Sequence, residues 1–226
     1  MKTKKRILQI GIISVVALFT ACTGKQQKVH DHNNMDVKSE VMASQHHNDD
    51  TTKMHNQHNS LANNFTHKDI IILAQTYQPA QETKAELELV IDAYIQLKDA
   101  LAKDNEKKAD KSVDLMSEKV AAVIPTKLEG MGLEAWKNHQ ALYEQKLKEM
   151  SHSKGLENKR SYFGHLSEIM YCTIKSFGLK QGNLFAIFCP MAFDGKGAYW
   201  ISDSKEIQNP YMGVKMPTCG EIKEEL

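Results

Sequence analysis

The stretch from residue 83 to residue 103, TKAELELVIDAYIQLKDALAK, decides the fold. Its apolar residues recur at steps of three and four, which places them along one side of an α-helix. They are Leu87, Val90, Ile91, Tyr94, Leu97 and Leu101. Thr83 and Glu86 have the Thr-x-x-Glu spacing of a capping box, so we expect the helix to begin there and to end near Lys103. A helix with one apolar side must bury it against other elements of the fold.

Three more amphipathic segments follow this helix. The second begins near residue 105, stops at Pro125 and has the stripe Ala109, Val113, Met116, Val120, Val123 and Ile124. The third has the stripe Leu133, Trp136, Gln140, Tyr143, Leu147 and Met150. The fourth, over residues 157–177, points Phe163, Leu166, Ile169, Met170, Thr173 and Phe177 inward and is capped by Gly178. Four such helices joined by short loops predict a mainly α fold, an antiparallel four-helix bundle.

The pattern changes after residue 182. Residues 184–188 and 199–201 are short apolar runs, and glycines and prolines interrupt the sequence between and after them. We expect a short irregular or β tail packed on the bundle, so that residues 83–226 form one folded domain. Because this tail has no hydrophobic periodicity of its own, we expect a disulfide or a bound metal to hold it.

Sulfur-bearing side chains are concentrated in this tail. Thiolate and thioether ligands select soft monovalent ions, so the chain is predicted to bind Cu(I) or silver here. The predicted ligands are Cys189 and Cys219, with Met191, Met212 and Met216 completing the site. The alternative is a disulfide between Cys189 and Cys219, because paired cysteines of exported chains are often bridged, and the methionines would then only pack.

The first 21 residues have the pattern of a lipoprotein signal peptide. Four basic residues precede an apolar run over residues 7–19, and small residues precede Cys22. Cys22 resembles the acylated cysteine of a bacterial lipoprotein. We therefore expect a lipid anchor at Cys22 in the cell envelope, on the periplasmic face of the outer membrane, with the membrane as one partner.

Residues 22–82 are predicted to be a disordered tether rich in histidine and methionine. Residues 25–64 have scarcely any large apolar residue to bury, so this part does not favour folding. Its imidazole donors are predicted to bind copper or other divalent metals at several weak sites. They are His30, His32, His46, His47, His55 and His58. The alternative is compositional drift in an unconstrained linker.

Other classes of function find no support in the sequence. After loss of residues 1–21, 25 basic residues face 28 acidic ones, and their interspersed charges give no basic surface for nucleic acid. No Gly-x-Ser-x-Gly, His-Glu-x-x-His or phosphate-loop motif is present, so no enzymatic activity is expected. A second donor cluster from His139, His165 and Cys172 is a weaker alternative to ordinary core positions for these residues.

Taken together, several motifs resemble a known family. They are Phe-Cys-Pro-Met-Ala at 188–192, Gly-Ala-Tyr-Trp-Ile-Ser at 197–202, Ile-Gln-Asn-Pro-Tyr-Met-Gly at 207–213, and Met216 through Cys219-Gly220. The chain resembles, over about residues 84–222, the uncharacterised helical domain found alone in small exported proteins and fused to periplasmic adaptor subunits of copper/silver efflux systems. The resemblance implies heavy-metal handling outside the cytoplasm. It also implies an efflux adaptor complex as a partner.

The resulting expectation is a lipid-anchored periplasmic copper or silver binding protein, a scavenger or chaperone accessory to metal efflux or resistance. The alternative is a non-metal interaction module that docks on an efflux adaptor, with a structural Cys189–Cys219 disulfide. A third class is an envelope protein that sequesters several metals and delivers none.

Overall fold

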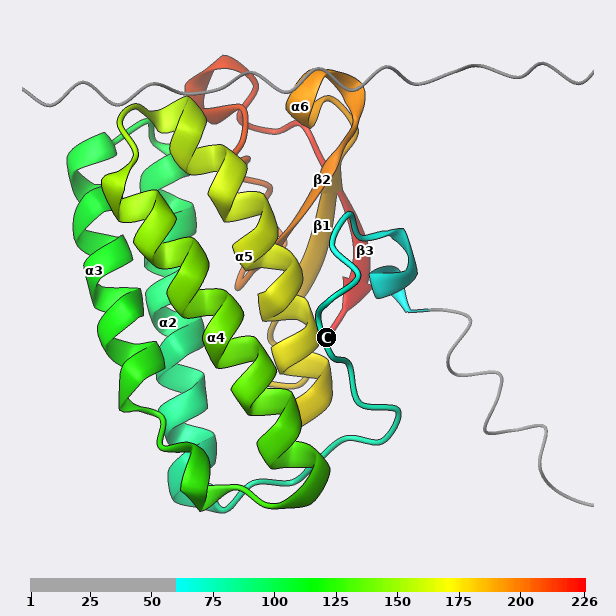
Figure 1. The fold of residues 1–226 in the computed structure, drawn as a ribbon. Helices are drawn as coiled ribbons and strands as arrows, with labels where there is room; N and C mark the ends of the chain where they lie inside the picture. The colour runs from blue at the N-terminus through cyan, green and yellow to red at the C-terminus, as the bar shows by residue number, and fades with distance from the viewer. Residues whose placement is uncertain (1–59) are drawn as a thin grey trace, which may run out of the picture. The chain divides into compact units, whose positions relative to one another are not determined.

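The computed structural model describes residues 60–226, which are mainly helical with a small antiparallel three-stranded sheet near the C-terminus (Figure 1). The long helices are α2 (Gln81–Ala102), α3 (Glu106–Ala122), α4 (Gly130–His152) and α5 (Leu156–Phe177). The sheet is made by β1 (Phe185–Cys189), β2 (Ala198–Ser202) and β3 (Glu221–Glu225). The short elements are η1 (Leu61–Asn64), η2 (Pro125–Lys127), α6 (Ala192–Gly195) and η3 (Gly213–Lys215). The expected mainly α class with a β tail is confirmed.

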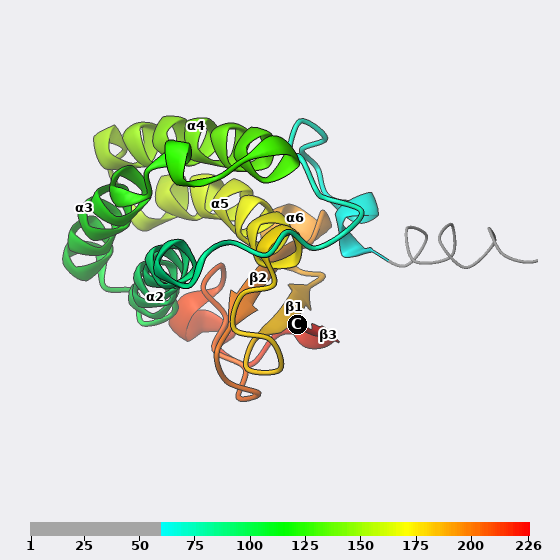
Figure 2. The same ribbon diagram turned by 90° about the horizontal axis from the view of Figure 1, so that it is seen from below.

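Each long helix buries most of the stripe that its sequence predicts. Leu87, Leu97, Met116, Tyr143 and Phe163 are all fully buried in one core. Consecutive helices pack against each other and run alternately up and down (Figure 1). Seen from below, α2, α3, α4 and α5 surround a shared interior, with α5 next to the sheet (Figure 2). Burial of apolar stripes is therefore what assembles this part of the molecule.

Helix ends differ from expectation in two places. The predicted capping box does not start α2: the helix begins at Gln81, its N-cap Ala80 makes no side-chain cap, and Thr83 faces the core with 1% of its surface exposed. Ile124 lies beyond the end of α3 and is 48% exposed, so it does not extend the stripe of that helix. The predicted cap of α5 is confirmed, because Gly178 adopts the left-handed conformation (φ 60°) that glycine tolerates best.

Residues 60–80, here called the N-terminal strap, are ordered against the helices, which corrects the expected tether boundary at residue 82. Phe65 is 3% exposed and packs edge-on against Tyr171 of α5 at 5.2 Å. The Tyr77 amide donates to the Ser176 carbonyl (2.8 Å). Phe65 and Ile70 are buried in the core, Ile72 and Leu73 pack against it, and the backbone finds partners on α4 and α5. Burial of a few apolar side chains plus these hydrogen bonds fixes the strap.

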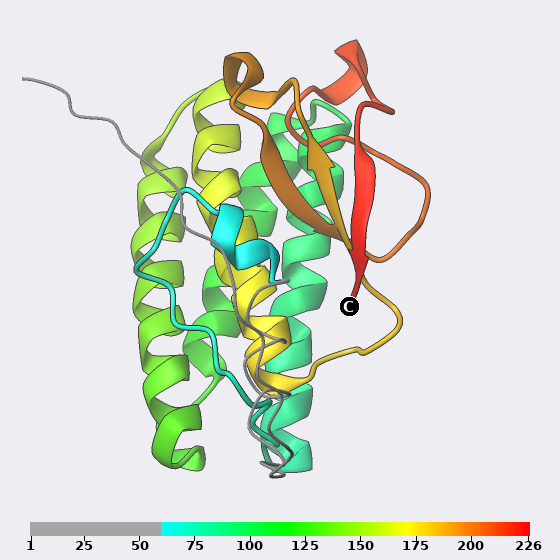
Figure 3. The same cartoon turned by 90° about the vertical axis from the view of Figure 1, so that its right-hand side faces the viewer.

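The sheet has the strand order β2-β1-β3 and lies beside the helices (Figure 3). β1 pairs with β2 in the register Ile187 to Trp200, and with β3 across a bulge between Ala186 and Ile187. β2 contacts α5, and Trp200 and Ile201 are buried there. β3 was not expected as a strand, because Glu-Ile-Lys-Glu-Glu has the composition of solvated surface. It is an edge strand with exposed charges, which is a common place for such residues.

Two expectations concern residues that the structure does not describe. The signal peptide and Cys22 lie in residues 1–59, as do all six histidines predicted to bind divalent metals. Within residues 60–226, no helix is long and apolar enough to cross a membrane.

Candidate functional site

The two predicted thiol ligands lie side by side. Cys189 ends β1 and is fully buried, whereas Cys219 lies between η3 and β3 and is partly exposed. Their Sγ atoms are 3.0 Å apart, and both cysteines are free thiols. The hydrogen bond to Cys189, followed by burial, raises the pKa of the Cys219 thiol. The fold thus brings Cys189 and Cys219 together, although thirty positions separate them in the sequence.

Asn209 holds the segment that carries Cys219. Its side chain is fully buried, and Nδ2 donates to the Cys219 carbonyl at 2.5 Å. Its Oδ1 accepts from the amides of Tyr211 (2.8 Å) and Met212 (2.9 Å), and its own amide donates to the Pro217 carbonyl (2.8 Å). This explains the Asn-Pro-Tyr-Met-Gly motif in structural terms. The asparagine closes the turn and fixes residues 217–219 against it.

Arg160 of α5 ties the same turn to the helices. Nε donates to the Pro210 carbonyl at 2.7 Å and Nη2 to the Leu101 carbonyl at 2.9 Å. Nη2 also pairs with Asp104, whose other oxygen accepts from the Val214 amide at 3.2 Å. A planar guanidinium with several donors can make all of these contacts at once. Arg160 is therefore one of the contacts that position the turn.

Tyr211 is the buried anchor of the turn. Its hydroxyl lies within hydrogen-bond distance of the Tyr199 carbonyl and of Ser167 Oγ (3.3 Å), and Ser167 Oγ is 2.7 Å from the Tyr94 hydroxyl. Burial raises the pKa of Tyr211 well above its ordinary value, so the phenol stays protonated. This polar network links α2, α5, β2 and the turn, and every member has a partner, which is the condition for such a network to stabilise a core.

The three predicted thioether ligands lie on the same segments as the thiols. Met191 and Met216 are 54% and 39% exposed, whereas Met212 is half-buried and packs against the core. The Met191 amide points at the Cys219 sulfur, and the Cys219 amide donates to the Met216 carbonyl at 3.3 Å. Met191 and Met216 are thus backbone neighbours of Cys219, with side chains that solvent reaches.

The spacing of the two sulfurs bears on what the pair can do. Two thiolates bound to one tetrahedral ion at about 2.3 Å each would lie about 3.8 Å apart. A disulfide needs about 2.05 Å. The observed 3.0 Å lies between the two values, so either outcome requires a displacement of about 1 Å or less. Among residues 60–226, no group of three or more His, Cys, Asp and Glu side chains is arranged to hold a metal ion.

The second cluster considered from the sequence does not form. His139 is a satisfied core histidine, with Nε2 2.6 Å from the Ile71 carbonyl and Nδ1 3.1 Å from Thr173 Oγ1. Burial lowers the pKa of His139 to about 4. Burial, and then the charge of Glu168, raise the pKa of Cys172 to about 12, so this thiol stays protonated and unreactive.

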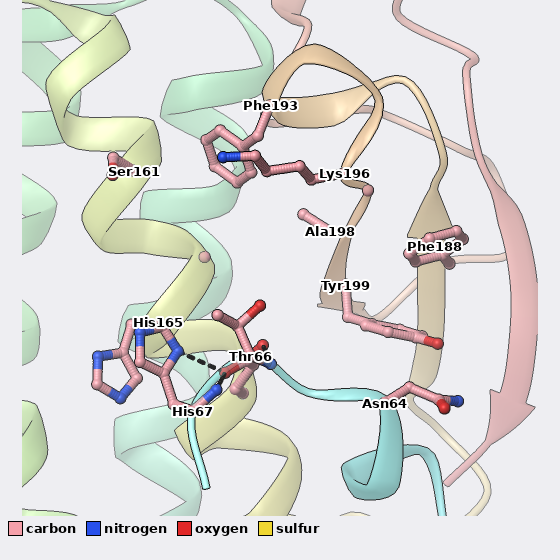
Figure 4. Close-up of a pocket in the computed structure, with 13 residues that line it drawn as sticks. Asn64, Thr66, His67, Ser161, His165, Phe188, Phe193, Lys196, Ala198 and Tyr199 are labelled. Atoms are coloured by element: carbon pink, nitrogen blue, oxygen red, sulfur yellow. Dashed lines mark hydrogen bonds and ion pairs between the residues drawn. The ribbon is translucent and has the colours of Figure 1, made fainter. Parts of the chain in front are cut away.

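His165 instead belongs to a pocket that the sequence did not reveal. Its ring stacks on that of His67 from the strap, with centroids 3.4 Å apart, and His67 Nδ1 lies 2.6 Å from Glu168 Oε2 (Figure 4). Burial, and then the nearby His67 and Lys146, lower the pKa of His165 to about 4. A single glutamate on an amphipathic helix has the pattern of solvated surface, and His67 lay within the expected tether. No sequence signal therefore pointed to this pairing.

Comparison with known proteins gives one match. Residues 90–182 match the model of a family described as a protein of unknown function, DUF3347. The match spans most of α2 and all of α3, α4 and α5, and it ends before β1, so Cys189, Asn209 and Cys219 lie outside it. No curated protein and no solved structure matches the chain.

Proposed function

We propose that this protein binds a soft monovalent metal ion, Cu(I) or Ag(I), through the thiolates of Cys189 and Cys219. The observation that carries the proposal is the juxtaposition of the two sulfurs, 3.0 Å apart, on segments fixed by Asn209. Most of the site is preorganised, because the turn and β1 are held by contacts that do not involve the sulfurs. Binding an ion then needs only a small opening of the pair and loss of two protons.

The neighbouring methionines support a soft ion over zinc. Met191 and Met216 are exposed residues whose backbones neighbour Cys219, and thioethers contribute much to a Cu(I) site and little to a Zn(II) site. Thioethers also keep their ligand character under oxidising conditions that remove thiols. A low-coordinate sulfur site near the surface is suited to taking up and releasing an ion.

The rest of the proposal extends the sequence expectations. The protein would be anchored by lipid at Cys22 to the periplasmic face of the outer membrane, with the histidine tether as a weak collector of copper and other metals. The four long helices would form an antiparallel four-helix bundle, a rigid support for the site, since α2 and α5 contact each other and close the ring of helices. The proposed role is a scavenger or chaperone accessory to heavy-metal efflux, in contact with an efflux adaptor.

Competition for Cu(I) tests the proposal. Reduced protein lacking residues 1–21 is titrated against a chromogenic Cu(I) chelator, and we expect tight binding of one ion per chain. Replacing Cys189 and Cys219 with Ser should lower the affinity by about 100-fold or more, because both thiolates are lost. Replacing Met191, Met212 and Met216 with Leu should lower it by about tenfold while keeping the fold, because Leu conserves volume. Cys172→Ala is the matched control and should change nothing.

A second candidate function is favoured by the short sulfur separation itself. At 3.0 Å the sulfurs are closer than two thiolates on one ion, so a structural disulfide with an interaction role on an efflux adaptor is the rival. Alkylation of protein isolated without reductant separates the two. A disulfide blocks modification of Cys219 until reductant is added, whereas a bound ion blocks it until a chelator is added. If the reduced protein binds no Cu(I), the interaction module replaces the metal site.

A further inference from the structure

A pocket of about 310 Å³ lies between the N-terminal strap, α5 and the connection from β1 to β2 (Figure 4). This volume is in the range of small-molecule sites. Its walls are aromatic on the sheet side, where the rings of Phe188 and Tyr199 contact each other at an interplanar angle of 43° with centroids 4.7 Å apart, and small on the helix side, at Gly164 and Ser161. The pocket does not include Cys189, because that side chain points to the face of β1 opposite Phe188.

The two ends of the pocket differ in charge. At one end Lys196 reaches toward Phe193 near Ser161 (Figure 4), and no ion-pair partner lies near its ammonium group in the described part of the chain. At the other end Glu168 has its oxygens taken by the amides of Thr66 (2.9 Å) and His67 (3.1 Å) and by His67 Nδ1. The free cation is therefore at the Lys196 end, and the acid at the far end is already bound by hydrogen-bond donors.

The turn that carries Phe193 and Lys196 is strained. Phe193 (φ 52°, ψ 52°) and Asp194 (φ 58°, ψ 38°) both have the left-handed backbone conformation, which residues other than glycine adopt at a cost in free energy. This geometry lays the Phe193 ring against Gly164, where an added Cβ would lie 3.3 Å from Phe193 Cε2. The strained turn therefore places the Phe193 ring over a glycine of α5 and carries Lys196 on the wall of the pocket.

His165 adds an independent sign of a missing partner. It is 5% exposed and lines the pocket behind His67, and neither of its ring nitrogens has a hydrogen-bond partner among residues 60–226. Buried polar atoms are seldom left unpaired, because the lost hydration is not replaced. The wall of the pocket behind His67 therefore carries a buried polar group without a hydrogen-bond partner in the described part of the chain.

We propose that this pocket binds a small planar aromatic carboxylate, with the carboxylate at Lys196 and Ser161 and the ring against Tyr199 and Phe188. A carboxylate pairs with the free ammonium and accepts from the hydroxyl, and a flat ring matches the aromatic wall. An amine is disfavoured at Lys196. The pocket and the Cys189–Cys219 pair use different residues, so each proposal stands or fails without the other.

Calorimetry with three matched probes tests this binding site. The probes are 2-naphthoate, the neutral 2-naphthamide and the cationic 2-naphthylmethylamine, titrated into protein lacking residues 1–21. We expect a dissociation constant for the carboxylate about tenfold or more below that of the amide, and the weakest binding for the amine. Lys196→Met should remove the difference between carboxylate and amide and leave amide binding unchanged. Lys215→Met, at another exposed lysine, is the matched control and should change neither.

A variant that fills the pocket locates the binding. Gly164→Leu puts a side chain into the space beside Phe193 and should abolish binding of all three probes, while circular dichroism shows retained helices. Equal affinity for the three probes would overturn the proposal. Tighter binding of the amine would also overturn it and would indicate that Glu168, not Lys196, selects the ligand by charge. Undiminished binding in folded Gly164→Leu would place the ligand elsewhere. If that variant fails to fold, the Lys196→Met comparison decides alone.

Discussion

The helices and the C-terminal sheet region, residues 184–226, are held together in different ways. In α2 to α5 the contacts are made by apolar stripes such as Leu87, Leu97 and Phe163, which are fully buried. In the sheet region, polar groups with defined partners position the chain: Asn209 closes the turn, and Arg160 and Tyr211 fasten it to the helices. Apolar burial is non-directional, whereas each of these hydrogen bonds requires one geometry.

This difference explains where the candidate metal site lies. A site for a small ion needs its ligands on segments with defined positions. The directional contacts around Asn209 provide such positions for Cys219, and the β1 ladder provides one for Cys189. The helices support the sheet region as a whole. We therefore expect variants of the two regions to fail in different ways.

The largest effect is expected from the helical core. Leu97→Ala removes a fully buried side chain and should lower the free energy of unfolding by about 2–5 kcal/mol, because it leaves a cavity. Leu89→Ala on the same helix removes a side chain that is 48% exposed and should change it by about 0.5 kcal/mol or less. Urea unfolding followed by circular dichroism measures both. Equal losses would contradict a helical layer stabilised by one buried stripe.

Asn209→Ala should come next and should act on the sheet region. It leaves the Cys219 carbonyl and two turn amides without their partners, at a cost of about 2–4 kcal/mol. We expect faster alkylation of Cys219 with an unchanged helical signal. Asn183→Ala, whose side chain makes one long contact of 3.4 Å, is the control. Loss of the helical signal at native conditions would show that the two regions do not separate.

The pH dependence of stability should arise from histidines buried between the helices and the strap. The pKa of His139 and of His165 is lowered to about 4 in the folded protein, so the unfolded chain binds more protons below about pH 6.5. Stability should therefore fall as the pH drops from about 6.5 toward 4 and then level off with respect to these groups. His165→Phe should reduce the difference between urea midpoints at about pH 7.5 and about pH 5. An unchanged difference in His165→Phe would remove His165 as a cause of the pH dependence.

The smallest effect is expected from Arg160→Lys. Lysine keeps the charge but cannot serve the Pro210 carbonyl, the Leu101 carbonyl and Asp104 together, so we expect a loss of about 1 kcal/mol. Lys137→Ala breaks an exposed ion pair with Glu134 and should cost about 0.5 kcal/mol or less. Chemical unfolding compares them. If both variants are neutral, the turn is held by Asn209 and Tyr211 without help from Arg160.

Much of the helical part was predictable from residue spacing. The stripes, the stop at Pro125 and the cap at Gly178 are local signals that need no knowledge of the partner element. β1 and β2 were visible as short apolar runs. β3 was not, because a charged edge strand has the composition of solvated chain. The strap was not either, because its apolar run at residues 70–74 lay inside the segment expected to be a tether and its contacts with α4 and α5 are tertiary.

The candidate site divides in the same way. The sequence identified Cys189 and Cys219 by residue type, but only the folded chain shows that their sulfurs meet. The pocket was invisible in the sequence, since His67, Glu168 and Lys196 come from three segments with no shared pattern. Whether two distant residues lie together depends on how the intervening elements pack.

The sequence by itself determined the helices of this protein, because hydrophobic periodicity and helix-ending residues act within a few positions along the chain. It also determined which residues have thiol or thioether groups that could serve as soft metal ligands. Tertiary structure alone decided that Asn209 positions Cys219, that the strap packs across α4 and α5, and that Lys196 has no ion-pair partner near an aromatic pocket among residues 60–226. These features depend on directional contacts between segments far apart in the chain, and no local pattern encodes such contacts.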